Sequence, residues 1–318
     1  MTADPRPLVE SPISVLGESG ITSVTEFARR VTGWVGLPEP RLERLGMNAV
    51  YTAGPAVVRI GLATVDPVVA VDLADRLVSE GFEVPAPFTR SSFRHDVMNR
   101  TVWATVWTRV HPDPGTRPDW RHIGALTDRL HRLEPRSVAD IHPLPRAADF
   151  GWWDLGPILT GFAEGGVDFV STGELQRLVD EWSELGPTLR RARESDGLVV
   201  CHGDLHPGNV VVDSITGRTV LLDWDLVSLA PTGWDHAPLV GWAPRWGDDH
   251  RAYDEFASGY GTDLRDDRDT ASLARLRLLV ATVMRIRAAM IDPGAVPEVR
   301  NRLRYWTEGE SAPPWNAA

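Results

Sequence analysis

The sequence predicts an α+β fold in which a small β-rich part precedes a larger, mainly helical part. Three short β-like runs, residues 41–46, 48–54 and 56–62, follow one another with only turn signals between them, as in an antiparallel meander. From Asp119 onward, apolar residues recur at helical spacing over long stretches. The segment HPDPGTRP, residues 111–118, separates the two patterns and is the best candidate for a boundary.

The first part contains two expected helices and one further strand besides the meander. Residues 23–35 carry apolar side chains near helical spacing, and residues 66–81 begin with Asp-Pro and end with Gly, as a helix should. Residues 101–110 alternate Thr, Val and Trp, which is typical of a strand. We therefore expect an N-terminal lobe over residues 21–110, preceded by an extended arm over residues 1–20.

Helical periodicity dominates the second part, residues 111–318. It is clearest over residues 123–134 and 273–290, and it covers residues 172–195 with Gly186-Pro187 as a candidate break. Three short strands are expected within this part: residues 197–200, 209–213 and 217–225. The second part is therefore a larger, mainly helical lobe.

Composition narrows the function classes. The chain is 42% hydrophobic and 24% charged, and its net charge of −11 argues against nucleic acid as a partner. No apolar run approaches the roughly 20 residues of a membrane span, and no basic region followed by an apolar one marks a secretory signal. Because Cys201 is the one cysteine, no internal disulfide can form, and we expect a cytoplasmic location. All 33 basic residues are arginine, which excludes any lysine-dependent mechanism.

A polar loop between two apolar strands carries the densest chemistry. The segment CHGDLHPGN, residues 201–209, includes Asp204 and Asn209. Asp223 lies near the end of the expected strand 217–225. Strand, turn and strand can bring Asp223 beside Asn209, and one carboxylate with one amide oxygen is a usual protein contribution to a Mg²⁺ site. Asp204 would stay free to orient a hydroxyl or accept its proton. The arrangement suits phosphoryl transfer, in which the protein mostly positions groups and neutralises charge.

These residues resemble the aminoglycoside phosphotransferase and choline kinase superfamily. The resemblance rests on HGDLHPGN, LLDWD and GWDHAPL, strongly over residues 198–240 and loosely over the rest of the chain from Ser23. It implies a protein-kinase-like fold with a small antiparallel β-rich N-lobe and a larger mainly helical C-lobe. It also implies that Asp204 is the catalytic aspartate and that Asn209 and Asp223 are the Mg²⁺ ligands.

Other residues near the loop take roles from the same resemblance. His206 occupies the place where protein kinases carry a lysine near the transferred phosphate, and its imidazole can donate a hydrogen bond there. His202 has a structural role, and Asp235 resembles the helix-borne aspartate that braces the catalytic loop. Asp225 is either a helper of the metal site or a solvated acid. Cys201 is expected to be a buried packing thiol rather than a nucleophile.

The resemblance extends upstream into the β-rich part. LGMNAVY matches the phosphate-covering turn of the family, with Gly46 and Asn48 in the turn. AVVRIGL places Arg59 where the family carries its phosphate-binding cation, and strand alternation would turn Arg59 away from the apolar core. ATVWTRV falls where the hinge reads adenine through the backbone, from Thr105 to Val110.

The cation site departs from the family pattern in two ways. Arg59 stands where a lysine is expected, and the helix after it lacks a glutamate at the expected place, which falls near Ala70. Either Asp66 or Asp72 pairs with Arg59 in a shifted register, or the ion pair is absent.

The sequence thus predicts a Mg²⁺- and ATP-dependent small-molecule kinase whose acceptor is a hydroxyl of an amino sugar, antibiotic, sugar or amino alcohol. The acidic tract over residues 246–269 lies where the family often builds its acceptor site and would suit a cationic substrate, although it can equally be a solvated surface. A nucleotide-binding regulatory protein without turnover is the alternative, supported only by the doubtful Arg59 pairing. A protein kinase is disfavoured because no Asp-Phe-Gly precedes an Ala-Pro-Glu segment.

Overall fold

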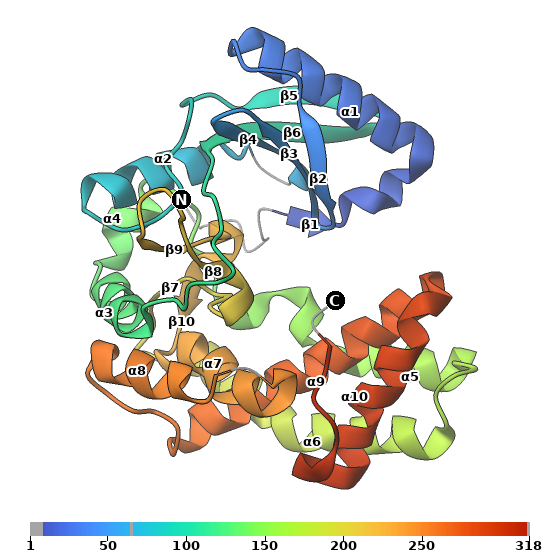
Figure 1. Ribbon diagram of the computed structural model, residues 1–318. Coiled ribbons are helices and arrows are strands. Elements are labelled where there is room, and N and C mark those ends of the chain that lie inside the picture. Colours follow the sequence, from blue (N-terminus) through green and yellow to red (C-terminus); the bar gives the residue numbers. More distant parts are fainter. Residues whose placement is uncertain (1–8, 64–65, 248, 317–318) are drawn as a thin grey trace. The chain divides into compact units, whose positions relative to one another are not determined.

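The computed structural model describes residues 9–63, 66–247 and 249–316, which fall into two compact units (Figure 1). The N-terminal unit is made of residues up to 119 together with residues 134–145 and 208–227. The helical unit is made of residues 120–133, 146–207 and 228–318. Each unit therefore joins segments that lie far apart in the sequence.

An antiparallel sheet forms the centre of the N-terminal unit. Its strands run in the order β2 (Arg41–Leu45), β3 (Asn48–Ala53), β4 (Ala56–Ala63), β6 (Arg100–Thr108) and β5 (Phe93–Val97), and β1 (Val9–Ser11) also pairs with β4. The predicted meander is confirmed in β2, β3 and β4, and the predicted strand at 101–110 in β6. The sequence did not predict β5, because only its first and last residues are apolar.

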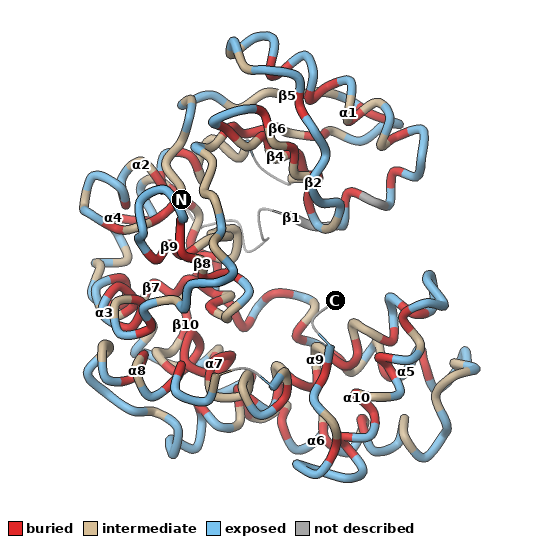
Figure 2. Tube along the Cα trace, in the orientation of Figure 1, coloured by how far each residue is buried: buried red, intermediate tan, exposed pale blue. Residues whose placement is uncertain are grey.

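Helix α1 (Gly17–Trp34) covers one face of this sheet, as its apolar periodicity predicts. Val58 and Ile60 of β4 are fully buried in one core with Phe27 of α1. Arg59 lies between them in the strand and therefore points to the opposite face. The central strands β4 and β6 are largely buried, whereas the edge strand β2 is exposed (Figure 2).

The N-terminal unit is completed by four elements: α2 (Val68–Ser79), α4 (Pro135–Ala139), β8 (Val210–Val212) and β9 (Thr219–Leu221). The β8–β9 hairpin is bonded to distant parts of the unit. Leu221 N–H donates to the Glu83 carbonyl at 3.2 Å, and His111 N–H donates to the Asp213 carboxylate at 2.9 Å. These bonds fix the hairpin that precedes Asp223.

The helical unit is built from helices packed around a short two-stranded sheet. The helices are α3 (Trp120–His131), α5 (Leu155–Gly165), α6 (Thr172–Glu194), α7 (Gly233–Trp246), α8 (Arg251–Tyr260), α9 (Arg268–Ile291) and α10 (Val296–Glu308). Helix α3 packs against α8, and α9 packs against α6, α7 and α10. The approach of α3 to α8 requires a glycine, because a β-carbon at Gly259 would lie 1.9 Å from the Arg121 carbonyl oxygen.

Some local expectations change in the structure. Residues 9–20 of the expected arm include β1, a 3₁₀ helix (Ile13–Leu16) and the first residues of α1, while residues 1–8 lie outside the described residues. The expected break at Pro187 is wrong, because α6 continues through it. Leu185 and Leu189 are buried on either side, so packing holds the helix despite the missing N–H donor. Within the described residues, no helix is long and apolar enough to cross a membrane.

Candidate active site

The loop that carries Asp204 follows a strand that is hydrogen-bonded to a neighbouring strand. Strand β7 (Val199–Cys201) pairs antiparallel with β10 (Ser228–Ala230), which the sequence did not predict. The chain then turns at Gly203, whose φ of +88° lies in the region that favours glycine. The glycine of HGD thus lets the backbone turn sharply just before Asp204.

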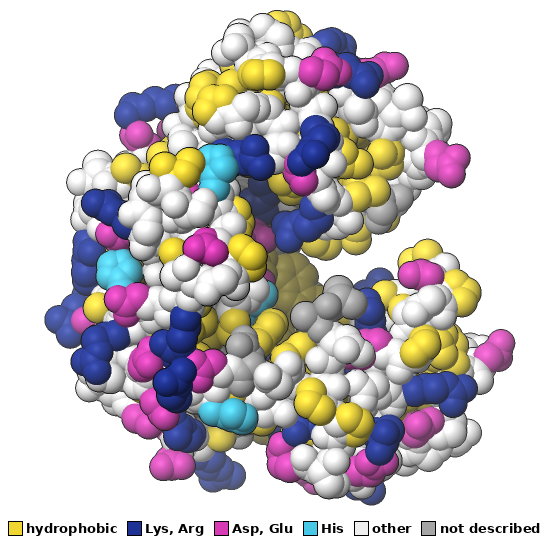
Figure 3. All heavy atoms as spheres, viewed as in Figure 1, with side chains coloured by type: hydrophobic (Ala, Val, Ile, Leu, Met, Phe, Trp, Pro, Cys, Tyr) yellow, Lys and Arg dark blue, Asp and Glu magenta, His cyan; other side chains and the backbone are white. Residues whose placement is uncertain are grey.

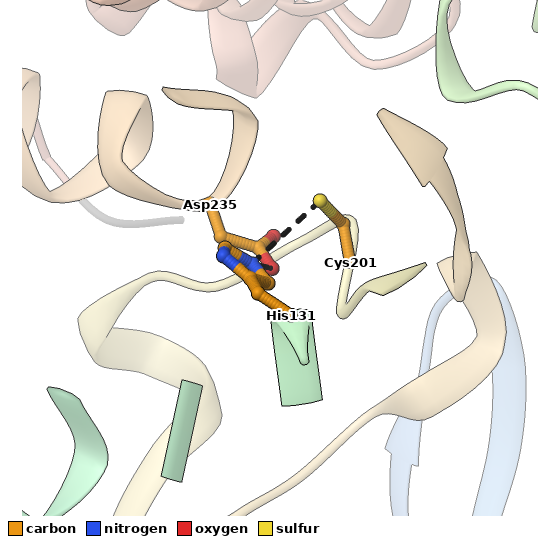
Figure 4. A group of neighbouring side chains, drawn as sticks. All are labelled: His131, Cys201 and Asp235. Carbon is orange, nitrogen blue, oxygen red and sulfur yellow. Dashed lines mark hydrogen bonds and ion pairs between the residues drawn. The ribbon is translucent and has the colours of Figure 1, made fainter. Parts of the chain in front are cut away.

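Asp235, near the start of α7, holds this loop from its buried side (Figure 4). Its Oδ2 accepts from His202 N–H at 2.8 Å, and its Oδ1 accepts from Gly203 N–H at 2.9 Å. Oδ2 also lies 3.1 Å from His131 Nε2 on α3. Burial opposes the charge, but the contacts with His131, His202 and Gly203 outweigh it and lower the pKa of Asp235. The ionised carboxylate therefore fixes two consecutive amides of the loop.

Cys201 completes a buried group with His131 and Asp235, and all three residue types can bind metals. Sγ of Cys201 lies 3.7 Å from His131 Nε2, and His131 Nδ1 lies 2.9 Å from the Tyr260 hydroxyl. Both oxygens of Asp235 already accept hydrogen bonds from the loop. Burial raises the pKa of Cys201 well above its ordinary value, so the thiol is protonated in this hydrogen-bonded group. The group acts as a hydrogen-bonded brace of the loop.

Asp204 is held by two basic side chains. His206 Nε2 lies 3.6 Å from Oδ2, and Arg277 Nη1 on α9 lies 3.4 Å from Oδ1. Burial raises the pKa of Asp204, but the hydrogen bond and charge of His206, followed by the charge of Arg277, lower it to about 2. The side chain is 33% exposed. Asp204 is therefore an accessible carboxylate that stays ionised at neutral pH.

Sequence reasoning missed Arg277. The signal available was its position, because Arg277 follows Leu273 by about one helical turn and so falls on the apolar stripe of α9. An arginine on such a stripe is buried and needs a partner.

Asn209 and Asp223 lie at the same end of the β8–β9 hairpin. Val210 pairs with Leu221 there, and Leu222 N–H donates to the Asn209 carbonyl at 2.8 Å. Asp223 has a φ of +62°, which is uncommon for a non-glycine residue and occurs preferentially at functional sites. The donor set of one amide and one carboxylate fits Mg²⁺.

Arg59 joins Asp223 and Asp225 to the sheet. Its Nη2 lies 3.0 Å from Asp223 Oδ1, and its Nη1 and Nη2 contact the two oxygens of Asp225 in a fork. The Asn48 amide, oriented as its neighbours require, accepts from Arg59 Nη2 at 2.6 Å and from Nε at 3.0 Å. Burial opposes the charge, but Asp225 and Asp223 raise the pKa of Arg59. Burial and the charge of Asp223 raise the pKa of Asp225 in turn.

The acids expected to pair with Arg59 do not contact it. Asp72 is exposed on α2, and Asp66 binds the backbone at the start of that helix. Ala70 lines the same pocket as Arg59 and carries no charge. The negative charge comes instead from the segment after β9, so the ion pair is present with Asp225 and Asp223 as its acids.

A pocket opens on this face of the sheet, opposite the α1 core. Its lining residues come from β3, β4, α2, β6 and the segments beside them: Asn48, Arg59, Gly61, Ala63, Pro67, Ala70, Trp103, Thr105, Trp107 and Asp225. Thr105 pairs with Arg59 across β4 and β6, and Trp107 Nε1 donates to Thr105 Oγ1 at 2.8 Å. Apolar and aromatic walls around a few fixed polar groups are typical of small-molecule sites.

Two further candidate residues lie at the ends of this sheet. Gly46 is in the β2–β3 turn, and a β-carbon there would meet nothing within 4 Å. Val110 follows β6, and its neighbours Arg109 and His111 donate their N–H groups to Pro55 and Asp213. Among the residues that the structure describes, the N–H and carbonyl of Val110 have no hydrogen-bond partner.

The fold and site define the class of protein. A β-rich unit with an arginine on its sheet that pairs with two aspartates, and a helical unit with a clamped aspartate loop, are the parts of a protein-kinase-like phosphotransferase. The model of the phosphotransferase enzyme family matches residues 54–276, and the chain belongs to this family. No curated protein matches the chain.

Solved structures share the fold at low sequence identity. Spectinomycin phosphotransferase APH(9)-Ia, in complex with ADP and spectinomycin, is 15% identical, with a TM-score of 0.60 over 89% of this chain and 93% of that chain. Aminoglycoside phosphotransferase APH(3'')-Id from Streptomyces rimosus is 22% identical, with a TM-score of 0.56 over 81% and 98%. A microcompartment-associated aminopropanol kinase is 17% identical, with a TM-score of 0.62 over 91% and 99%. The predicted family and protein-kinase-like α+β fold are confirmed.

Proposed function

We propose that this phosphotransferase transfers the γ-phosphoryl group of ATP, bound with Mg²⁺, to a hydroxyl group of a small molecule. The observation that carries the proposal is the fixed, ionised carboxylate of Asp204 in a loop clamped by Asp235. A carboxylate with a pKa of about 2 is a weak base. Its role is therefore to orient the acceptor hydroxyl and take the proton late, which suits a loose transition state. His206, beside Asp204, would donate a hydrogen bond to the transferred group.

The phosphate side of the reaction is assigned to the N-terminal unit. Arg59 supplies a fixed cation for the nucleotide phosphates, supported by Asn48, and the open turn at Gly46 would cover them. Asn209 and Asp223 would hold Mg²⁺, which neutralises charge on the triphosphate when bound.

The base of the nucleotide is assigned to the end of β6. The Val106 carbonyl accepts from Phe88 N–H at 2.9 Å, and Thr108 N–H donates to the Ala86 carbonyl at 2.8 Å, so the segment before β5 already occupies these two groups. Val110 offers the next backbone edge, and the Thr105 side chain would line the site. Solved neighbours carry ADP, AMP or GDP, so both ATP and GTP are to be tried as donors.

The acceptor is proposed to be a hydroxylated small molecule such as a sugar, an amino sugar, an amino alcohol or an antibiotic. Neighbours of the same fold have been solved with spectinomycin, streptomycin and kanamycin. The composition of the acidic tract 246–269 suggested a site for a polycationic acceptor. The contacts of its acids weaken that argument. Four of its described acids pair with arginines or cap a helix: Asp249 with Arg251, Asp254 with Arg265, Asp269 with Arg191, and Asp267 at the start of α9. Figure 3 shows acidic and arginine side chains interspersed on the face in view.

The regulatory alternative loses its support. It depended on a missing partner for Arg59, and Arg59 has two acidic partners. The kinase proposal therefore stands alone.

The test is a screen of ATP and GTP consumption against a panel of neutral sugars, amino sugars, amino alcohols and antibiotics. We expect at least one acceptor to stimulate turnover and Asp204→Asn to reduce kcat by at least about a hundredfold while nucleotide binding is retained. Asp196→Asn, at an exposed position before β7, is the matched control and should keep wild-type turnover. Full activity of Asp204→Asn would contradict the role of Asp204.

A further inference from the structure

Arg277 contacts the catalytic loop at two points. Its Nη2 donates to the Gly203 carbonyl at 2.7 Å, and its Nη1 lies 3.4 Å from Asp204 Oδ1. One planar guanidinium therefore reaches both the backbone of the turn and the carboxylate that follows it. A rigid fork of this kind defines direction as well as distance, which a point-like ammonium does not.

Two indole rings hold the guanidinium in place. Its central carbon lies 5.3 Å from the ring centroid of Trp153 and 5.6 Å from that of Trp234. The two rings are themselves nearly perpendicular, with centroids 5.1 Å apart. Arg277 thus sits in an aromatic corner that restricts its rotation and favours its positive charge. Both indoles are buried, so the corner belongs to the rigid core of the helical unit.

The placement of Arg277 has an electrostatic cost that its contacts offset. The side chain is 15% exposed. Burial lowers the pKa of Arg277, and the charges of Asp204 and Asp235 act in the opposite direction without fully cancelling this effect. A mostly buried cation is tolerated when it is paired and hydrogen-bonded. A helix stripe that needed only packing would carry a leucine here, so the arginine indicates a requirement of the loop itself.

We propose that Arg277 is the positioning residue of the catalytic loop: its guanidinium, fixed between Trp153 and Trp234, holds the Gly203 carbonyl and the Asp204 carboxylate in the orientation that receives the acceptor hydroxyl. The kinetic part of this inference rests on the proposed function. The structural part, that Arg277 orders the loop, does not.

Arg275 provides a matched control on the same helix. It makes a two-point ion pair with Glu181 at 2.7 and 2.8 Å and lies 5.4 Å from the Trp306 ring centroid. Arg275→Met therefore removes an ion pair and an aromatic contact of the same kind, without a contact to the loop. Arg277→Met removes the charge and the fork, and Arg277→Lys keeps the charge alone.

Hydrogen exchange of the free full-length protein tests the ordering of the loop without any acceptor. We expect Arg277→Met to speed amide exchange in peptides covering residues 199–207 by at least about tenfold and Arg275→Met to leave them unchanged. Arg277→Lys should fall between wild type and Arg277→Met. Equal exchange in the Met variants of both arginines, or wild-type exchange in Arg277→Met, would overturn the proposal. If circular dichroism shows that Arg277→Met does not fold, Arg277→Lys decides, and wild-type exchange in that variant is the contradicting result.

Steady-state kinetics separate positioning from a general structural role. Arg277→Met should lower kcat by at least about thirtyfold and change KM for ATP by less than about twofold, with partial rescue in Arg277→Lys. In the Asp204→Asn background, Arg277→Met should lower kcat by less than about threefold, because the carboxylate that Arg277 orients is already absent. Independent, multiplying losses would contradict the proposal. A wild-type protein that consumes no nucleotide with any acceptor would refute the proposed function, while the exchange experiment would still decide the ordering by Arg277.

Discussion

Asn48 and Gly61 face each other across β3 and β4, and the Asn48 side chain occupies the space that a side chain at Gly61 would need. A β-carbon at Gly61 would lie 2.0 Å from a terminal atom of the Asn48 amide. The Asn48 amide in turn accepts hydrogen bonds from Arg59. A missing side chain on β4 thus allows a polar cluster to form on the sheet.

Gly61→Ala should displace Asn48 and loosen Arg59. Overpacking at such a site costs about 1–3 kcal/mol, so we expect a loss of that size in the free energy of unfolding and a higher KM for ATP. Urea unfolding and steady-state kinetics measure the two effects. In an Asn48→Ala background, Gly61→Ala should lower the free energy of unfolding clearly less. The control Gly33→Ala on α1, where a β-carbon meets nothing within 4 Å, should not destabilise the protein. Equal costs of Gly61→Ala in both backgrounds would disprove the steric coupling.

Arg59→Ala should raise KM for ATP and lower kcat. The substitution removes the fixed cation and leaves Asp223 and Asp225 without their counter-charge. Arg59→Lys should restore only part of the loss, because an ammonium cannot form the fork to Asp225. Kinetics with varied ATP measure both variants. Wild-type kinetics in Arg59→Ala would direct the search for the phosphate cation to another arginine.

Asp223→Ala should weaken nucleotide binding in the presence of Mg²⁺ and abolish transfer, because this carboxylate is the candidate metal ligand beside Asn209. Isothermal titration with ADP, with and without Mg²⁺, measures the first effect. The Mg²⁺-dependent gain in affinity should disappear in Asp223→Ala and persist in Ser214→Ala, at an exposed position on the same hairpin. If wild-type turnover is insensitive to EDTA, the metal assignment is wrong.

Asp235 predicts how stability depends on pH. Its folded-state pKa lies below the ordinary value of 3.8, so the folded protein favours the ionised form. The resulting stabilisation is complete above that value and is lost as pH falls through the lowered folded-state pKa. Asp235→Asn should be less stable than wild type at pH 6 by about 2–4 kcal/mol, because its amide cannot accept both loop bonds as strongly.

Urea unfolding between pH 6 and pH 3 measures this difference. Asp235→Asn should lack the part of the acid-induced loss that Asp235 contributes, so the two stability curves should converge toward low pH. The exposed control Asp196→Asn should follow the wild-type curve. Parallel curves for wild type and Asp235→Asn would show that the pKa of Asp235 is not lowered by folding.

Local patterns predicted much of the fold. The meander, α1, α2 and the strands around the polar loop follow from alternation, helical spacing and turn residues, which act over a few neighbouring positions. Local patterns failed where tertiary packing decides. Strand β5 has too few apolar residues to show alternation, and Pro187 stays inside α6 because buried leucines hold it there.

The sequence by itself determined which chemical groups are proposed for phosphoryl transfer. Asp204, Asn209 and Asp223 stand in one short region because the loop and hairpin that carry them are contiguous in the chain. Partners from distant segments were decided by the tertiary structure alone. Arg59 meets Asp225 across 166 positions, and Arg277 meets Asp204 across 73. The physical reason is that a charge buried by packing must find its counter-charge wherever the fold brings one, and no local periodicity records which segment that will be.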